Sequence, residues 1–224
     1  MFRVLLSSLV CTMFLVAGVS AEDLLYHENL RGDLTDYSIS IDDKQGNHEY
    51  TLTKTNDSAI LSIERIVVDS SGDTREWEYR DFSKDLHISA RRNGRMIQIE
   101  KRDGRRSINE ECTIPDSSPW HQLFPFGMEN FIVQGEKERA FWFIQPQNLA
   151  LSSMKAVRGE EKLINRHGIM ERATEVKISI NNWLSRFWKG LYLLRSDDGR
   201  YLFYEGILRK NLARGTVELV KEQL

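Results

Sequence analysis

The sequence predicts an all-β protein with minor helix: an open antiparallel barrel or strongly curved meander sheet of about eleven strands with short lid helices. Apolar and polar residues alternate with period two in several stretches, which places one set of side chains on each face of a strand. Two-residue turn signals separate these stretches, and no long linker or repeat interrupts them. Each strand therefore has one face toward water, as is typical of antiparallel sheets.

The alternating stretches define the expected strands. The apolar positions are clear in Tyr37-Ile39-Ile41 and in Val176-Ile178-Ile180. Asn93-Gly94 and Asp103-Gly104 mark tight hairpins, because their first residues tolerate positive φ and glycine accepts it freely. In chain order the expected strands are 34–42, 48–55, 58–68, 74–80, 85–92, 95–102, 105–112, 138–145, 149–157, 162–181 (with a turn or bulge near Gly168) and 188–208 as a hairpin.

Two stretches predict the short lid helices. Ser118 is suited to cap a helix over residues 118–124, Pro119 fits its first turn, and Pro125 ends it. Asn182 is likewise suited to cap one turn over residues 183–187. We expect such segments to lie across the mouth of a curved sheet.

Residues 1–21 have the features of a cleaved secretory signal peptide. Arg3 precedes an apolar run over residues 4–19, and Val19-Ser20-Ala21 supplies the small residues of a cleavage site. A retained anchor needs about 20 apolar residues, and this run is shorter. Cys11 lies inside the run rather than at its end, which disfavours lipidation. We therefore expect one β half-barrel domain over residues 22–224, exported to the periplasm, with no stable membrane span after processing.

Charge and cysteine content restrict the partners. Residues 22–224 carry 30 Lys and Arg against 33 Asp and Glu, a net charge of −3. Nucleic acid and anionic membranes are disfavoured, because both call for a basic patch and a positive balance. Cys112 is the single cysteine after processing, so stability must come from burial rather than from an internal disulfide.

The sequence carries no recognisable catalytic or metal-binding motif. The histidines are scattered and form no His-x-x-x-His pair; they are His27, His48, His87, His121 and His167. Cys112 is nine residues before His121, but an isolated free cysteine usually acts as a small buried hydrophobe. There is no Gly-x-Ser-x-Gly elbow, P-loop or dinucleotide fingerprint. We expect no enzyme activity, no metal and no cofactor.

The aromatic stretch Asn181-Asn182-Trp183-Leu184-Ser185-Arg186-Phe187-Trp188-Lys189-Gly190 is the strongest local feature. It leads into a hairpin whose arms, 191–194 and 201–204, are apolar on both faces. One face serves the barrel interior and the other needs cover. Either the segment from Trp120 to Ile132 packs over it, or the cover is partial and an acyl chain or similar molecule completes it, with Arg186 or Lys189 meeting a polar head.

Several segments together resemble a known family. They are Phe141-Trp142-Phe143-Ile144-Gln145-Pro146, the strand ending Val176-Lys177-Ile178-Ser179, the aromatic stretch from Trp183 to Trp188, and Tyr192 to Tyr204 closing on Glu205-Gly206. Over about residues 25 to 210 the chain resembles a family of uncharacterised bacterial periplasmic β-proteins. That family is similar in general plan to the lipoprotein carriers of the Gram-negative periplasm, which have an open half-barrel with helices as a lid. The resemblance implies a carrier-like fold and brings no catalytic motif.

These observations predict a non-enzymatic periplasmic protein of the cell envelope that binds a hydrophobic or lipid-like ligand in the concave apolar face of its sheet. The expected ligand-binding residues are Phe141, Phe143, Trp183, Arg186, Phe187, Trp188 and Tyr192. The alternative is an envelope protein–protein interaction module whose barrel is filled by side chains. A hydrolase on the same barrel is a third possibility without a matching constellation. A cavity separates the first two, because a filled barrel cannot carry a ligand.

The first testable prediction concerns export. If Val19-Ser20-Ala21 is the cleavage signal, the mature protein begins at Glu22. N-terminal sequencing of the protein isolated from the periplasm checks this directly. A start at Met1, or acylation at Cys11, would contradict it.

Overall fold

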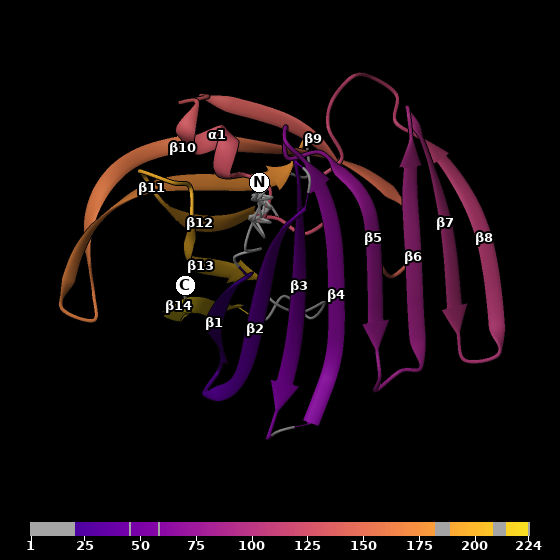
Figure 1. The fold of residues 1–224 in the computed structure, drawn as a ribbon, viewed down its shortest axis with the longest axis horizontal. Coiled ribbons are helices and arrows are strands. Elements are labelled where there is room, and N and C mark those ends of the chain that lie inside the picture. The colour runs from indigo at the N-terminus through magenta and orange to yellow at the C-terminus, as the bar shows by residue number, and fades with distance from the viewer. Residues whose placement is uncertain (1–20, 45, 58, 182–188, 208–213, 224) are drawn as a thin grey trace, which may run out of the picture.

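A computed structural model describes residues 21–44, 46–57, 59–181, 189–207 and 214–223. Within these ranges the chain forms one antiparallel sheet of fourteen strands and one short helix (Figure 1). The elements are β1 Ala21–Leu30, β2 Asp33–Lys44, β3 Asn47–Asn56, β4 Ala59–Asp69, β5 Thr74–Asp81, β6 Leu86–Asn93, β7 Met96–Asp103, β8 Arg106–Thr113, α1 Glu129–Val133, β9 Glu138–Ile144, β10 Leu151–Arg166, β11 Ile169–Ile180, β12 Lys189–Arg195, β13 Tyr201–Ile207 and β14 Arg214–Gln223. The predicted all-β class and open, strongly curved sheet are confirmed.

The sheet places the first strand beside the last. Its order is β8-β7-β6-β5-β4-β3-β2-β1-β14-β13-β12-β11-β10-β9, so β8 and β9 are the two edges. Tyr26 of β1 pairs with Tyr37 of β2 on one side and with Leu219 of β14 on the other. The two halves of the chain, each a meander, are therefore joined edge to edge through a contact between its two ends.

The count of about eleven strands was low for identifiable reasons. The prediction omitted β1 and β14 and counted the hairpin of β12 and β13 as one element. The expected break between residues 157 and 162 is instead a register shift between Arg158 and Glu161 inside the continuous strand β10. A bulge keeps the backbone extended while it bends the strand, so it leaves the same gap in the alternation as a loop does.

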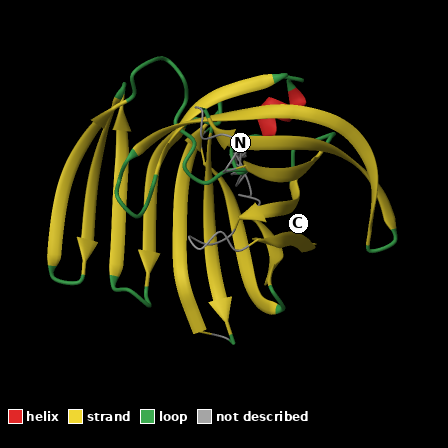
Figure 2. Cartoon of the chain, turned by 180° about the vertical axis from the view of Figure 1, so that it is seen from behind, coloured by secondary structure: helices red, strands yellow, loops and turns green. Residues whose placement is uncertain are grey.

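Alternation divides each strand into an inner and an outer face. On β1, Leu24, Tyr26, Glu28 and Leu30 are buried, while the residues between them are more exposed. The buried residues of neighbouring strands join them in one core cluster. Figure 2 shows the same sheet from behind, where strands make up nearly the whole chain and loops cap their ends. The concave face is therefore the apolar one.

The connection between β8 and β9 packs on that concave face and joins two distant strands. Trp120 forms an isolated parallel bridge with Trp142 of β9, and the Trp142 N–H donates to the Pro119 carbonyl at 2.8 Å. On its other side, the Thr74 N–H at the start of β5 donates to the Trp120 carbonyl at 2.7 Å. Trp120 is completely buried. The segment thus spans the opening between β5 and the edge strand β9.

Polar side chains satisfy this buried backbone. The Asp73 carboxylate accepts a hydrogen bond from the Trp120 N–H at 2.9 Å and forms an ion pair with Arg92. Gln122 accepts from the Trp120 indole at 2.8 Å and donates to the Ile144 carbonyl at 2.8 Å. A buried backbone group without a partner would cost free energy comparable to a lost hydrogen bond. These contacts fix the path of the connection.

The expected lid helix over 118–124 is wrong. Residues in this stretch are extended or bent, and the helix begins later, at Glu129. The sequence signals for a cap and a first turn are present, but the hydrogen bonds of Trp120 to β5 and β9 require an extended backbone there. The second expected helix, over 183–187, lies outside the described residues. Among those described, no helix is long and apolar enough to cross a membrane.

Gly72 and Gly127 lie where the connection meets the turn between β4 and β5. Gly94, in another turn, serves as a comparison. Gly72, in the turn between β4 and β5, has φ +83, and a Cβ on it would lie 2.2 Å from the Gly127 carbonyl oxygen. Gly94, in the turn between β6 and β7, has φ +61 but nothing within 4 Å of such a Cβ. Gly72 and Gly94 therefore share a left-handed backbone conformation, but a Cβ would clash only at Gly72.

We predict that Gly72→Ala lowers the free energy of unfolding more than Gly94→Ala does. The left-handed backbone costs each variant about 1 kcal/mol. The clash with the backbone of Gly127 adds about 1–3 kcal/mol to the first only, because the connection must move. Urea denaturation of both variants measures the difference. Equal losses would mean that the connection is not held against the turn between β4 and β5.

Candidate functional site

A cavity of about 280 Å³ lies between the inner face of the sheet and the connection. Its lining is mainly aromatic and aliphatic: Tyr26, Glu28, Tyr37, Ile39, Leu52, Leu123, Phe124, Pro125, Phe126, Tyr192, Tyr201, Tyr204 and Val217. An engineered apolar cavity of about 150 Å³ already binds benzene, and ligand pockets begin near about 300 Å³. The other depressions on the described surface, such as the one beside Arg65 and Glu76, have predominantly polar and charged linings.

The sheet order brings the tyrosines of this cavity together. Because β1 pairs with β14 and β14 with β13, Tyr26 reaches Tyr201 across 175 residues of sequence. The Tyr26 hydroxyl donates to the Tyr201 carbonyl at 2.9 Å, and the two rings stack with centroids 5.0 Å apart. Tyr192 and Tyr204, paired on β12 and β13, have ring centroids 4.7 Å apart. One wall of the cavity is therefore a continuous layer of tyrosine rings.

Two phenylalanines of the connection close the cavity from above this layer. Phe126 meets Tyr26 at 6.2 Å and Tyr201 at 5.7 Å between centroids, both edge to face. Phe124 meets Tyr192 in the same manner at 6.2 Å. Such edge-to-face pairs stabilise beyond their buried area. The connection therefore covers the concave side of the apolar hairpin, as the sequence allowed, and leaves a cavity beneath it.

Glycines on the neighbouring strands β12 and β13 make room for the Tyr204 ring. Gly206 of β13 pairs with Gly215 of β14, and Gly190 precedes Leu191, which pairs with Glu205. A Cβ on Gly206 would lie 2.3 Å from the Tyr204 hydroxyl, and one on Gly190 would lie 2.6 Å from the same ring. The Tyr204 ring therefore lies flat against bare backbone instead of filling the cavity.

The hydroxyls of Tyr192 and Tyr201 are available to a ligand. The two residues are only 6% and 7% exposed. No hydrogen bond joins either hydroxyl to a described residue, and both side chains line the cavity. Burial raises the pKa of each phenol well above its ordinary value, so both keep their protons. Each is a hydrogen-bond donor at the edge of an apolar space.

One buried ion pair forms the polar end of the cavity. The Glu28 carboxylate, 4% exposed, accepts from the Tyr37 hydroxyl and lies 3.2 Å from the Lys54 ammonium. Lys54 also donates to the Tyr37 hydroxyl at 2.6 Å. Burial, and then the charge of Glu28, raises the pKa of Tyr37 far above its ordinary value. Among the described residues that line the cavity, Glu28 is the one that carries a charge, and Lys54 balances it.

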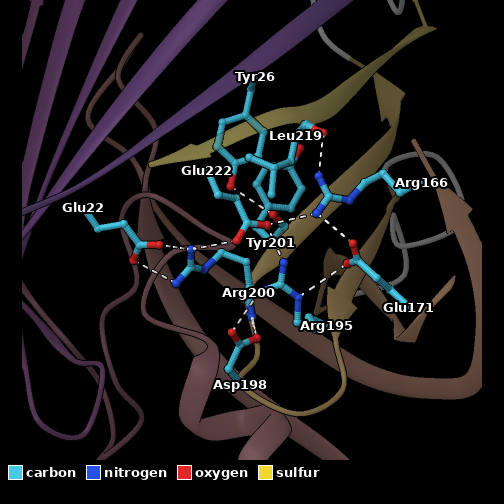
Figure 3. Close-up of polar contacts among 10 residues, drawn as sticks. All are labelled: Glu22, Tyr26, Arg166, Glu171, Arg195, Asp198, Arg200, Tyr201, Leu219 and Glu222. Atoms are coloured by element: carbon cyan, nitrogen blue, oxygen red, sulfur yellow. Dashed lines mark hydrogen bonds and ion pairs between the residues drawn. The ribbon is translucent and has the colours of Figure 1, made fainter. Parts of the chain in front are cut away.

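A network of arginines and glutamates lies beside Tyr26 and Tyr201 (Figure 3). Its members are Glu22, Arg166, Glu171, Arg195, Arg200 and Glu222. Arg166 lies 2.9 Å from Glu171 and 3.0 Å from Glu222, and its guanidinium also donates to the Leu219 carbonyl at 3.1 Å. Partly buried pairs of this kind add little net stability but specify which strands meet. The network ties β1, β10, β11, β12 and β14 together at that end.

Glu64 lies beside the cavity and has no countercharge in the part of the chain that the structure describes. It lies on the inner face of β4, opposite the cavity residue Leu52, and accepts from the Trp77 indole at 2.8 Å. Burial raises the pKa of Glu64 to about 7, and the Trp77 hydrogen bond opposes this shift in part. Near neutral pH this side chain is therefore partly protonated.

Burial shifts the pKa of both residues that the sequence offered for chemistry, His121 and Cys112. Burial, followed by the charge of Arg139, lowers the pKa of His121 to about 3, so its ring is neutral between Trp120 and the edge of Phe141. Burial and the Glu110 carboxylate raise the pKa of Cys112, which disfavours the reactive thiolate. No group of three His, Cys, Asp or Glu side chains is placed to hold a metal in the ranges that the structure describes.

The structure places three of the seven predicted ligand-binding residues. Tyr192 lines the cavity. Phe141 and Phe143 are not among the lining residues. Their ring centroids lie 5.7 and 5.2 Å from that of Phe124, so they support the connection that covers the cavity. The remaining four, Trp183, Arg186, Phe187 and Trp188, lie outside the described residues.

Sequence reasoning missed most of the lining. Tyr26, Glu28, Tyr37 and Leu52 come from β1, β2 and β3, far in sequence from the aromatic stretch that drew attention. A usable signal was the pattern Tyr26-x-Glu28, where a carboxylate takes the place of an apolar residue on the buried face of a strand. A charge at such a position calls for a buried partner or a ligand.

Comparisons with known proteins identify the fold. No family model matches the chain, and no curated protein matches it in sequence. Among solved structures, it is similar to a β-barrel-like protein of the domain of unknown function DUF1849 from Brucella abortus, with a TM-score of 0.57 at 9% identity over 92% of this chain and 98% of that one. A DUF1329 family protein from Desulfovibrio piger gives a TM-score of 0.30 at 8% identity, over 92% of this chain and 86% of that one. The first similarity shows a β-barrel-like fold.

The raised pKa of Glu64 predicts a pH-dependent effect of Glu64→Gln. Below about pH 4.5 the carboxyl is protonated in both the folded and the unfolded chain, so the substitution changes little. Between pH 4.5 and 7 the Glu64 carboxyl ionises in the unfolded chain before it does in the folded chain. The free energy of unfolding therefore falls by on the order of 1–3 kcal/mol over this range. The amide oxygen of Gln still accepts from Trp77. Glu64→Gln should therefore stabilise the protein at pH 8 and not at pH 4.

Urea denaturation at the two pH values measures this effect. Glu100→Gln is the matched control, because Glu100 lies exposed on the outer face of β7. An equal rise in the free energy of unfolding of both variants at pH 8 would reflect the change in net charge. It would contradict the raised pKa of Glu64 as the cause.

Proposed function

We propose that the protein is a non-enzymatic periplasmic binding protein that holds a hydrophobic or amphipathic ligand, such as a lipid, on its concave face. The observation that carries this proposal is the cavity between the tyrosine layer and the phenylalanines of the connection. Its lining has the composition of ligand sites: a mostly apolar and aromatic surface with a few placed polar groups. The β-barrel-like fold is compatible with this role.

The magnitude of apolar burial is sufficient for binding. A buried contact of about 300 Å² at about 25 cal/mol/Å² gives about 7 kcal/mol before ordering costs. With modest offsets this corresponds to affinities in the micromolar range. The features of a signal peptide in residues 1–21 support a periplasmic location, and the resemblance in plan to periplasmic carriers supports a role in holding a lipid-like molecule.

A second candidate function, docking of an envelope protein, is favoured by a different observation. The hairpin of β10 and β11 extends away from the rest of the sheet (Figure 1). Near its tip Leu163, Ile169 and Met170 are 65%, 63% and 59% exposed. Exposed apolar side chains on a projecting element are common at interaction sites. The cavity nevertheless favours ligand binding, because an interaction module has no need of a hollow interior.

Filling the cavity should abolish binding without unfolding the sheet. We expect the neutral dye N-phenyl-1-naphthylamine to bind the protein and gain fluorescence. Leu52 lies on the cavity wall, so Leu52→Trp should weaken dye binding at least about tenfold, because the larger ring occupies the space that the dye needs. Fluorescence titration measures the dissociation constants.

Thr51→Trp is the control, because it adds the same ring one residue away, on the outer face of β3, and should leave the dye affinity unchanged. Far-ultraviolet circular dichroism verifies that both variants fold. Unchanged dye binding by a folded Leu52→Trp variant would exclude the cavity as the binding site. A wild-type protein that binds no dye would give the docking function first place.

A further inference from the structure

We propose that the polar part of the ligand is an uncharged oxygen acceptor, an ester or amide carbonyl, held by the hydroxyls of Tyr192 and Tyr201. This inference rests on the proposed function, since it names the chemical class of the ligand for the same cavity. It excludes free fatty acids and other simple anionic amphiphiles as preferred ligands.

The hydroxyls of Tyr192 and Tyr201 are two donors at the cavity that no described residue engages. Both tyrosines are more than nine-tenths buried, line the cavity and donate no hydrogen bond to any described residue. By contrast, the hydroxyl of the neighbouring Tyr26 donates to the Tyr201 carbonyl at 2.9 Å. A phenol hydroxyl that lines a cavity without a hydrogen-bond partner among the described residues can donate to a ligand or to an ordered water there.

The chemistry of the hydroxyls makes the ligand atom an acceptor. Burial holds the pKa of Tyr192 and Tyr201 well above the ordinary value, so both phenols remain protonated and donate. Their ring centroids lie 6.1 Å apart, and both side chains line the same cavity. A carbonyl oxygen has two lone pairs and can accept from both.

The electrostatics of the cavity disfavour a charged head group. Glu28 is the sole charged residue among the described residues that line it, so a buried carboxylate or phosphate would have no cation to pair with. Lys54, which pairs with Glu28, already contacts both Glu28 oxygens and the Tyr37 hydroxyl. A ligand ammonium group would have to compete with Lys54 for the same carboxylate. An uncharged carbonyl incurs neither cost.

Three probes with the same chain test the proposal: methyl decanoate, sodium decanoate and decylamine. At pH 8 they are neutral, anionic and cationic. Each is used to displace N-phenyl-1-naphthylamine from the full-length mature protein. We expect methyl decanoate to displace the dye at a concentration at least about tenfold lower than either charged probe.

The variants Tyr192→Phe and Tyr201→Phe assign the effect to the hydroxyls. Each should weaken methyl decanoate about three- to tenfold, the loss of one neutral hydrogen bond. Neither should change the affinity of the dye itself, which has no carbonyl. Tyr79→Phe is the matched control, because its hydroxyl lies 3.4 Å from Asp81 and does not line the cavity.

The outcomes separate the two proposals. If the dye and all three probes fail to bind, the proposed function and this inference both fail. If the probes bind but decanoate equals or exceeds the ester, the cavity binds ligands and the inference alone fails. Preference for decylamine would likewise overturn it and would point to Glu28. Equal ester affinity in wild type, Tyr192→Phe and Tyr201→Phe would show that the hydroxyls do not hold the carbonyl.

Discussion

The buried contact between Asp73 and Trp120 fixes the element on which the rest of the interior depends. A sheet whose two meanders join through β1 and β14 leaves a broad concave apolar face that must be covered. The connection between β8 and β9 covers it, and the Asp73 carboxylate, paired with Arg92, holds that connection where β5 begins. Phe124 and Phe126 follow shortly after Trp120, so this one contact sets where the lid lies over the tyrosines. The cavity is a consequence of that placement.

The inner face of β1 orders the interior by polarity. Glu22 enters the arginine network, Tyr26 lies in the aromatic layer, and Glu28 ends the cavity with its own ion pair. Both charged regions are internally neutralised, which keeps the cost of partial burial tolerable. Between them the surface is apolar apart from phenolic hydroxyls. The interior is thus suited to an amphipathic molecule with a weakly polar group, rather than to an ion.

The sequence was sufficient for the fold class because alternation is local. Pairs such as Ile97 and Ile99, or Val176 and Ile178, need only a strand and one wet face, and the structure has both. The cavity could not be read in the same way, because Tyr26, Leu52 and Tyr201 meet only after β1 pairs with β14. Around Trp120 the local sequence predicted a helix that does not form. The backbone there is extended because it forms hydrogen bonds with β5 and β9. In both cases long-range pairing decided the outcome.

The apolar pocket beneath the connection is compatible with the proposed ligand. Protein cores are normally close-packed, and empty apolar volume lowers stability. Here Gly190 and Gly206 let the Tyr204 ring lie against the backbone, and Leu52 and Val217 line the remaining space. A barrel that served only as a scaffold for docking would gain stability from bulkier residues at these positions. A cavity bounded by stacked aromatic rings and buried phenols is better explained by a molecule that occupies it, which supports the binding role over the filled module.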